Sequence, residues 1–110
     1  MAKLFRTNEA ITEVKEWCIA ESKTQAFNFM NKFWDDGEIM EEHYVEPWLE
    51  ENPGLDINDF IEVFFIEENP AAEFTHPYGG ENDEPVTKTV QEWIDAAESV
   101  PSYLCHEKWD

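Results

Sequence analysis

The sequence predicts a mainly α fold, a small single-domain bundle of about four helices that takes up the whole chain, residues 1–110. A chain of 110 residues can bury one hydrophobic core and little more. Apolar residues make up 42% of it, which is enough to drive folding, and they recur at helical spacing in several segments. Turn-forming residues such as Asn52-Pro53-Gly54 separate these segments. We therefore expect one domain built from short amphipathic helices.

Two helices are expected near the N-terminus, over residues 8–21 and 24–35. In the first segment Ile11, Val14 and Cys18 fall at positions i, i+3 and i+7, which places them on one face of a helix. The second segment carries aromatic residues at similar spacing and runs into an Asp-Gly pair, a common helix stop.

Residues 38–51 carry a row of glutamates. Pro47 either kinks one continuous helix or begins a second short helix, where proline is tolerated. On a continuous helix, side chains four positions apart are neighbours at about 6 Å. The glutamates spaced in this way are Glu38, Glu42, Glu46 and Glu50.

The clearest helices are expected over residues 57–66 and 86–98. The first repeats apolar residues at i, i+3, i+4, i+7 and i+8, the full amphipathic pattern. Asp56 is suited to cap the first helix, and Thr87 or Thr89 the second; of these two, Thr89 matches the capping box with Glu92. Asp56 is likewise followed three positions later by an acidic residue, which is the capping-box pattern.

Two segments lie outside these helices, and one alternative fold stays open. The prolines and glycines of residues 69–85 predict an irregular loop that either binds a partner or is mobile. Aromatic and apolar residues in the tail, residues 102–110, indicate that it docks on the domain. The alternative is an α+β fold with a small sheet, in which residues 26–33 or 60–66 are strands, because Phe, Ile and Val also favour strands.

The charge of the chain is strongly negative and unevenly placed. The net charge is −19, and the stretch from Phe33 to Thr87 contains 17 carboxylates but no lysine or arginine. Such a surface repels nucleic acid and anionic lipid at long range. Direct binding to nucleic acid or to a membrane is therefore not expected, and the expected partner is a basic protein.

No catalytic, metal or cofactor site is expected. Cys18 and Cys105 lack the spacing of a metal site, and nothing marks two of the 26 carboxylates as a catalytic pair. Residues 56–67 match a calcium loop at three positions, but Ile61 stands where the loop needs glycine. We therefore expect neither enzyme activity nor a bound cofactor.

The location expected from the sequence is cytoplasmic, in the host cell if the chain is phage-encoded. The N-terminal residues lack the apolar run of a signal peptide, and no stretch approaches the length that spans a membrane. Two cysteines in a chain of this size also fit a reducing compartment.

The leading functional hypothesis is that the carboxylates imitate the phosphates of DNA. The protein would then occupy the nucleic-acid-binding surface of a host defence or DNA-processing protein. In size and charge it is similar to small acidic inhibitors that phages and mobile elements make against restriction, CRISPR or repair enzymes. The alternative is an acidic binding module or chaperone for a basic partner, without phosphate mimicry. In that case aromatic residues among the acids would act as anchors. The sequence leaves open whether the protein is a monomer or a homodimer.

The predicted partner-binding residues fall in two acidic patches with aromatic residues among them. One patch runs from Asp35 to Glu51, and the other from Glu67 to Glu84. The carboxylates are Asp35, Asp36, Glu38, Glu41, Glu42, Glu46, Glu50, Glu51, Glu67, Glu68, Glu73, Glu81, Asp83 and Glu84, and the aromatic residues are Tyr44, Trp48 and Tyr78.

Overall fold

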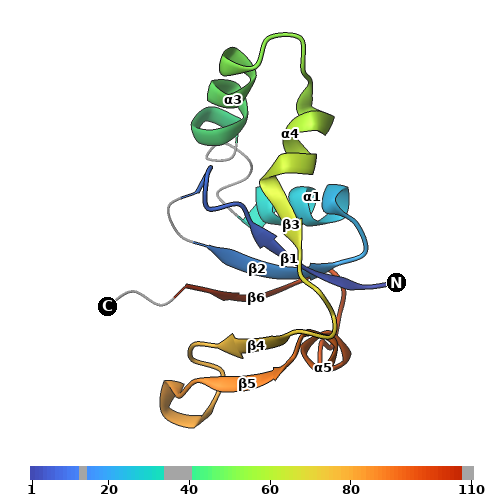
Figure 1. The fold of residues 1–110 in the computed structure, drawn as a ribbon, viewed down its shortest axis with the longest axis vertical. Helices are drawn as coiled ribbons and strands as arrows, with labels where there is room; N and C mark the ends of the chain where they lie inside the picture. Colours follow the sequence, from blue (N-terminus) through green and yellow to red (C-terminus); the bar gives the residue numbers. More distant parts are fainter. Residues whose placement is uncertain (13–14, 34–40, 108–110) are drawn as a thin grey trace.

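The chain folds as an α+β domain, so the predicted helical bundle is wrong. The computed structural model describes residues 1–12, 15–33 and 41–107. Over these residues the chain forms a four-stranded antiparallel sheet in the order β3-β1-β2-β6, which we call the central sheet, and a β4–β5 hairpin (Figure 1). The strands are β1 (Lys3–Thr7), β2 (Glu16–Ala20), β3 (Phe65–Glu67), β4 (Glu73–His76), β5 (Val86–Thr89) and β6 (Ser102–His106).

Short helices connect these strands. Among the described residues, four are α-helical: α1 (Lys23–Phe33), α3 (Glu46–Glu51), α4 (Ile57–Phe64) and α5 (Val90–Asp95). A π-helical turn, η2 (Glu41–Val45), leads directly into α3, and a 3₁₀ turn, η3 (Glu81–Asp83), lies between the strands of the hairpin. None of the helices among the described residues is both long and apolar enough to span a bilayer.

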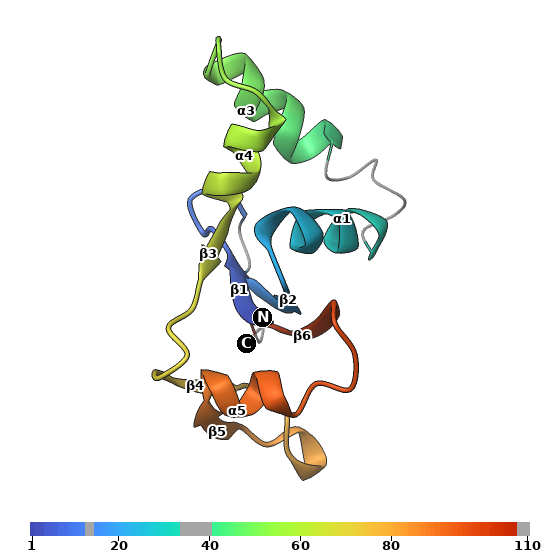
Figure 2. The same cartoon turned by 90° about the vertical axis from the view of Figure 1, so that its right-hand side faces the viewer.

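The central sheet is covered on both faces. Figure 2 shows α1, α3 and α4 on one side of it, and the β4–β5 hairpin with α5 on the other. Side chains alternate between the two faces along each strand. In β2, Cys18 and Ala20 face the helices, whereas Trp17 and Ile19 face the hairpin. The domain therefore has two hydrophobic cores with the sheet between them.

The helix-side core is the larger and is rich in phenylalanine. It unites the inner faces of α1 and α4 with one face of the sheet. Its buried residues are Phe5, Cys18, Ala20, Ala26, Phe27, Met30, Val45, Phe60, Ile61, Phe64 and Phe65.

The hairpin-side core packs the β4–β5 hairpin and α5 against the other face of the central sheet. The indole N–H of Trp93 donates a hydrogen bond to the Phe74 carbonyl at 3.0 Å, which fixes α5 on the hairpin. The buried residues of this core are Leu4, Trp17, Ile19, Phe74, Val90, Trp93, Ile94 and Cys105.

The helix predicted over residues 8–21 is the main error. Its second half is strand β2, of which Trp17–Ala20 is buried throughout because both faces of the sheet are covered. The sequence of a strand buried on both faces is a continuous apolar run. It lacks the alternation of apolar and polar residues that marks a half-exposed strand. Residues 102–106 of the tail dock as expected, because β6 pairs with β2 and Trp17 lies opposite Cys105; residues 108–110 lie outside the described residues.

The helix predicted over residues 86–98 is too long. Its first four residues form β5, which pairs with β4, and only Val90–Asp95 is α-helical. Thr89 caps α5 as predicted: its hydroxyl accepts the Glu92 N–H at 3.1 Å, and the Glu92 carboxylate accepts the Thr89 N–H at 3.0 Å. Those hydrogen bonds lower the pKa of the Glu92 carboxyl.

The two helices expected at residues 24–35 and 57–66 are present: α1 begins one residue earlier, and residues 34–35 lie outside the described residues, whereas α4 ends two residues earlier than expected. They form α1 and α4, so the strands of the alternative fold, residues 26–33 and 60–66, are also wrong except where β3 begins at Phe65. Asp56 caps α4 in a complete capping box. Gly54 lies in the preceding turn with φ of 94°, a conformation that favours glycine.

Candidate partner-binding surface

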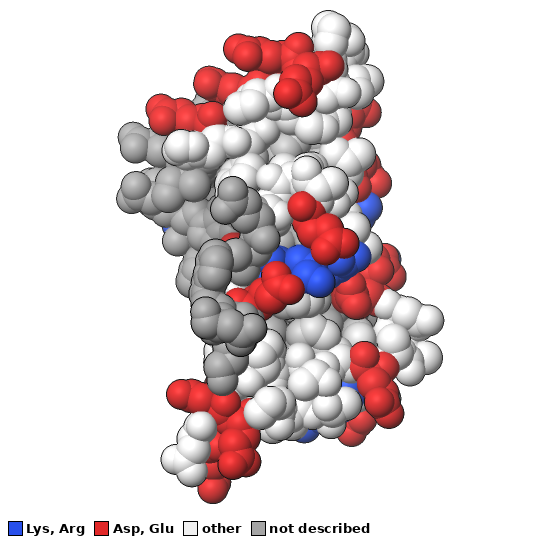
Figure 3. Space-filling view, turned by 60° about the vertical axis from the view of Figure 1, so that its left-hand side comes forward, with Lys and Arg blue, Asp and Glu red and all other residues white. Residues whose placement is uncertain are grey.

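The basic side chains lie mostly at the level of the central sheet, where carboxylates pair with them. Figure 3 shows the main group of lysine and arginine side chains near the middle of the molecule, with acidic side chains beside it. Among the described residues, the ion pairs are Lys3–Glu67, Arg6–Glu68, Arg6–Glu9, Lys15–Glu9, Lys15–Glu107 and Lys23–Glu62.

Two of the predicted partner-binding acids belong to this middle zone. The Arg6 Nε–H donates to a Glu68 carboxylate oxygen at 3.0 Å, and the Lys3 ammonium lies 3.2 Å from a Glu67 carboxylate oxygen. Pairing of β1 with β3 brings these residues together. The structure therefore separates Glu67 and Glu68 from the other predicted acids, because their charges are offset within the chain.

The first group of exposed acids lies on η2 and α3. We call these residues the helical end: Glu42, Glu46, Glu50 and Glu51, all exposed. The helix runs without interruption from Glu41 to Glu51, with Pro47 in the first turn of α3. No lysine or arginine occurs between residues 41 and 64. Of the row spaced by four, Glu46 and Glu50 are neighbours within α3, whereas Glu42 lies in the π-helical turn, where the spacing along the helix differs.

The second group lies in the loop of the β4–β5 hairpin. We call its three exposed acids the hairpin end: Glu81, Asp83 and Glu84. This loop is held by hydrogen bonds of its own, including Gly80 N–H to the Glu84 carbonyl at 2.8 Å. A β-carbon at Gly79 would lie 2.8 Å from the His76 ring, so glycine is needed there for close approach. The segment expected to be irregular, residues 69–85, thus contains one strand, β4, which carries exposed Glu73, while most of the rest forms turns and the hairpin loop.

The helical end and the hairpin end lie at opposite ends of the molecule (Figures 1 and 3). The domain is elongated, with dimensions of 44 × 33 × 23 Å. One turn of duplex DNA advances about 34 Å. The distribution of acids therefore extends over a length comparable to one turn of a duplex.

The predicted aromatic anchors pack on the chain itself. Tyr44 lies against Phe64, with ring centroids 5.9 Å apart, and Trp48 lies against Phe60 at 5.7 Å. Both are partly buried at the edge of the helix-side core. The structure therefore leaves only part of each ring exposed beside the helical end.

Three further predicted residues lie outside the described residues: Asp35, Asp36 and Glu38. Glu41 lies in η2, and its side chain is not described.

His76 and Tyr78 join the hairpin to the outer edge of β6. The Nδ1 atom of His76 accepts the Tyr78 N–H at 3.2 Å, so Nε2 carries the proton and faces the Leu104 carbonyl at 3.2 Å. The Tyr78 hydroxyl accepts the His106 N–H at 3.0 Å. Two polar groups on the edge of β6 are thus satisfied by side chains, and Tyr78 has a structural role.

The neutral form of His76 is required for this arrangement. His76 is 7% exposed and packs against Tyr78 and Trp93, with His106 on the far side of Tyr78. Burial lowers the pKa of His76, and the nearby His106 adds to this, against an opposing hydrogen bond to the Leu104 carbonyl. Protonation of Nδ1 would remove the acceptor for the Tyr78 N–H.

A His76→Gln variant is expected to lose stability at neutral pH but less at acidic pH. Because the folded pKa is below the ordinary value, the contribution of neutral His76 is complete above pH of about 6.5 and is lost as pH falls through the lowered pKa. Because two hydrogen bonds are lost, we expect the free energy of unfolding of the variant to be about 1–2 kcal/mol lower than that of the unchanged protein near neutral pH. Thermal unfolding of both proteins between about pH 7.5 and about pH 5 measures this difference. A difference that stays constant over that range would contradict the expected titration, and His43→Gln, at an exposed position on η2, is the control.

The two cysteines offer no reactive site. Cys18 and Cys105 are fully buried in different cores, on opposite faces of the sheet. Burial raises the pKa of each thiol to about 12, so neither forms the reactive thiolate near neutral pH. Among residues 1–12, 15–33 and 41–107, no three His, Cys, Asp or Glu side chains are placed to hold a metal ion.

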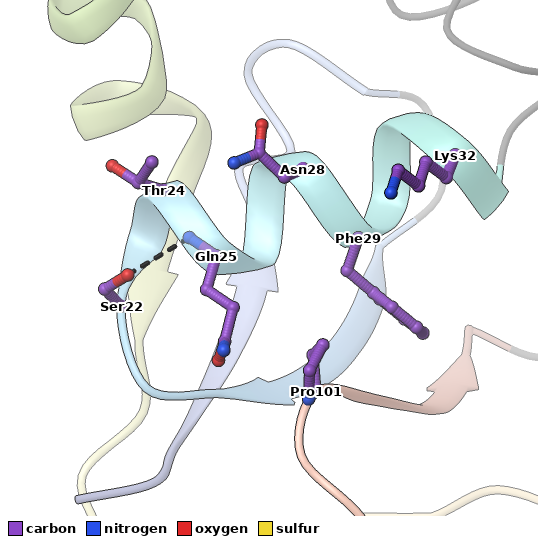
Figure 4. Close-up of a pocket in the computed structure, with 7 residues that line it drawn as sticks. All are labelled: Ser22, Thr24, Gln25, Asn28, Phe29, Lys32 and Pro101. Atoms are coloured by element: carbon purple, nitrogen blue, oxygen red, sulfur yellow. Dashed lines mark hydrogen bonds between the residues drawn. The ribbon is translucent and has the colours of Figure 1, made fainter.

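A shallow hollow of about 500 Å³ lies on the outer face of α1. The Ser22 hydroxyl at its rim already accepts the Gln25 N–H at 3.1 Å and caps the helix. In Figure 4 the side chains of Gln25 and Phe29 point toward Pro101, whereas Thr24 and Asn28 point away. Its polar groups therefore do not converge on one point, and we assign no site there.

A smaller groove of about 170 Å³ lies beside the helical end. The helical segment η2–α3 forms one wall and the turn after β1 forms the other. Its lining includes Ile11, Tyr44, Pro47, Trp48 and Glu51. No sequence pattern predicts this groove, because it arises where residues 10–11 meet a helix that follows them by more than thirty positions.

Comparison of the chain with protein-family models, with curated proteins and with solved structures found no match.

Proposed function

We propose that the protein is a small acidic inhibitor that occupies the nucleic-acid-binding surface of a basic protein in place of DNA. One observation carries this proposal: Lys3, Arg6, Lys15 and Lys23, four of the six described lysine and arginine residues, pair with carboxylates, while acids without such a pairing lie at both ends of the domain. Among the described residues, the acids of the helical end and of the hairpin end have no ion-pair partner. Their charges therefore remain available to another molecule.

The spacing of these charges supports a decoy for a duplex. The phosphates on one strand of B-form DNA follow one another at about 3.4 Å, and one turn takes about 34 Å. Neighbouring acids within α3 stand about 6 Å apart, and the domain is 44 Å long. A protein that grips DNA with lysine and arginine at sites one turn apart could contact both acidic ends at once.

The partner we propose is a host defence or DNA-processing protein, and the role is counter-defence by a phage or mobile element, such as anti-restriction or anti-CRISPR. The small size of the domain supports an inhibitor that acts by occupying a surface.

Competition with DNA tests the proposal. The immobilised protein is exposed to a lysate of the cells in which it acts, and retained proteins are eluted at constant ionic strength with duplex DNA or with an uncharged polymer. We expect the duplex to release a nucleic-acid-binding protein. We also expect the purified protein to abolish DNA binding by that partner in a mobility-shift assay. Retention in the presence of a large excess of duplex would contradict phosphate mimicry and point to an acidic binding module without it.

A further inference from the structure

We infer that the groove beside the helical end receives an arginine side chain of the basic partner. This inference rests on the proposed function and specifies how one part of the acidic surface recognises its target. The groove has a volume of about 170 Å³ and is lined by both apolar and polar groups: Ala10, Ile11, Tyr44, Pro47 and Trp48, with His43 and Glu51. Its features favour a cation that is planar and partly apolar.

The aromatic lining offers the faces that such a cation contacts. Tyr44, Pro47 and Trp48 come from consecutive turns of η2 and α3 and border the same hollow. The core side of these rings is fixed by packing on α4, through Phe64 and Phe60. A guanidinium stacks on aromatic rings, and its aliphatic stem can lie along the apolar wall formed by Ile11.

Charge complementarity selects a cation over other ligands. Glu51, the last residue of α3, is exposed at the groove and supplies a carboxylate that can accept two parallel N–H donors. Glu46 and Glu50 lie exposed on the same helix, and His43 is the one basic side chain in the described groove lining, which contains no lysine or arginine. Arginine fits this combination better than lysine, because its planar fork matches a carboxylate while its face stacks on a ring.

The test uses N-acetyl-L-argininamide as the probe and the neutral isostere N-acetyl-L-citrullinamide as its control, at equal ionic strength. Binding is followed by the NMR shift of the Trp48 indole N–H. We expect a saturable shift with the arginine probe, with a dissociation constant of about 1–10 mM, and at least about a tenfold weaker response to citrulline. No saturable shift with arginine, or an equal response to both probes, would overturn the inference.

Two variants of equal charge separate the groove from bulk attraction. Glu51→Gln is expected to weaken binding of the arginine probe by about threefold to tenfold, whereas Glu81→Gln, at the hairpin end, leaves it unchanged. Equal weakening in both variants would mean that the probe responds to net charge alone, and the inference would be wrong. Both positions are exposed, so the variants should fold.

Failure of this inference is distinct from failure of the proposed function. If the arginine probe does not bind while duplex DNA still displaces the partner, the groove assignment is wrong and the decoy proposal stands. If the probe binds in the groove but duplex DNA does not displace the partner, the groove recognises a basic protein without imitating DNA.

Discussion

Replacing Phe60 with alanine is expected to destabilise the domain by about 3–5 kcal/mol. Phe60 is fully buried and lies where three helices meet. Its ring contacts Phe27 of α1 at a centroid distance of 6.2 Å, Trp48 of α3 at 5.7 Å and Phe64 of α4 at 5.1 Å. Domains of this size have total stabilities of about 5–15 kcal/mol, so the loss is a large share of the whole.

Urea unfolding followed by far-ultraviolet circular dichroism measures the effect of Phe60→Ala. Val63→Ala in the same helix is the matched control, because Val63 is 40% exposed and its replacement should change stability by no more than about 0.5 kcal/mol. A loss below about 1 kcal/mol for Phe60→Ala would mean that the helix-side core closes around the vacated space.

Neutralising either acidic end is expected to weaken partner binding by about tenfold or more at an ionic strength of about 0.1 M. One variant changes Glu42, Glu46 and Glu50 to glutamine, and it spares Glu51 so that the groove stays intact. Because the proposed contact uses both ends of the domain, removing three charges at one end should reduce both the affinity and its dependence on salt.

The matched variant at the hairpin end changes Glu81 and Glu84 to glutamine and Asp83 to asparagine. It should lose a similar share of the affinity, because it removes the same charge. Glu21, Asp95 and Glu98 are exposed acids outside both ends, and neutralising these three together is the control. Titration of the purified partner by fluorescence anisotropy measures each affinity. An equal loss in the control would mean that the partner responds to net charge rather than to the placement of the acids.

The sequence predicted the parts of the fold that depend on neighbouring residues. The capping boxes at Asp56 and Thr89 require only side chains three positions apart, and both are present. The amphipathic pattern of residues 57–65 is local, and it predicted the buried residues of α4, Phe60, Ile61 and Phe64, although Ile57 is exposed and Phe65 lies in β3.

The parts that failed depend on pairing between distant segments. β2 is recognisable as a strand only because β1 and β6 flank it and two layers cover it, which no short window of sequence contains. For the same reason the sequence could not show that Lys3 and Arg6 offset Glu67 and Glu68. The composition predicted that the surface is acidic. It could not predict that carboxylates near the sheet are paired with basic residues while those at the two ends are not, because that depends on the register of β1 with β3.

The position of β6 has a consequence for how the chain is made. Trp17 pairs with Cys105, so the central sheet joins residues from the two ends of the sequence. During synthesis, β1 and β2 leave the ribosome long before their last neighbour, and both cores stay incomplete until residues 102–106 emerge. Contacts of such long range slow folding, because the loop between the partners must close first. The nascent chain therefore exposes Trp17 and Ile19 until residues 102–106 emerge, and its high negative charge can keep it in solution in that interval.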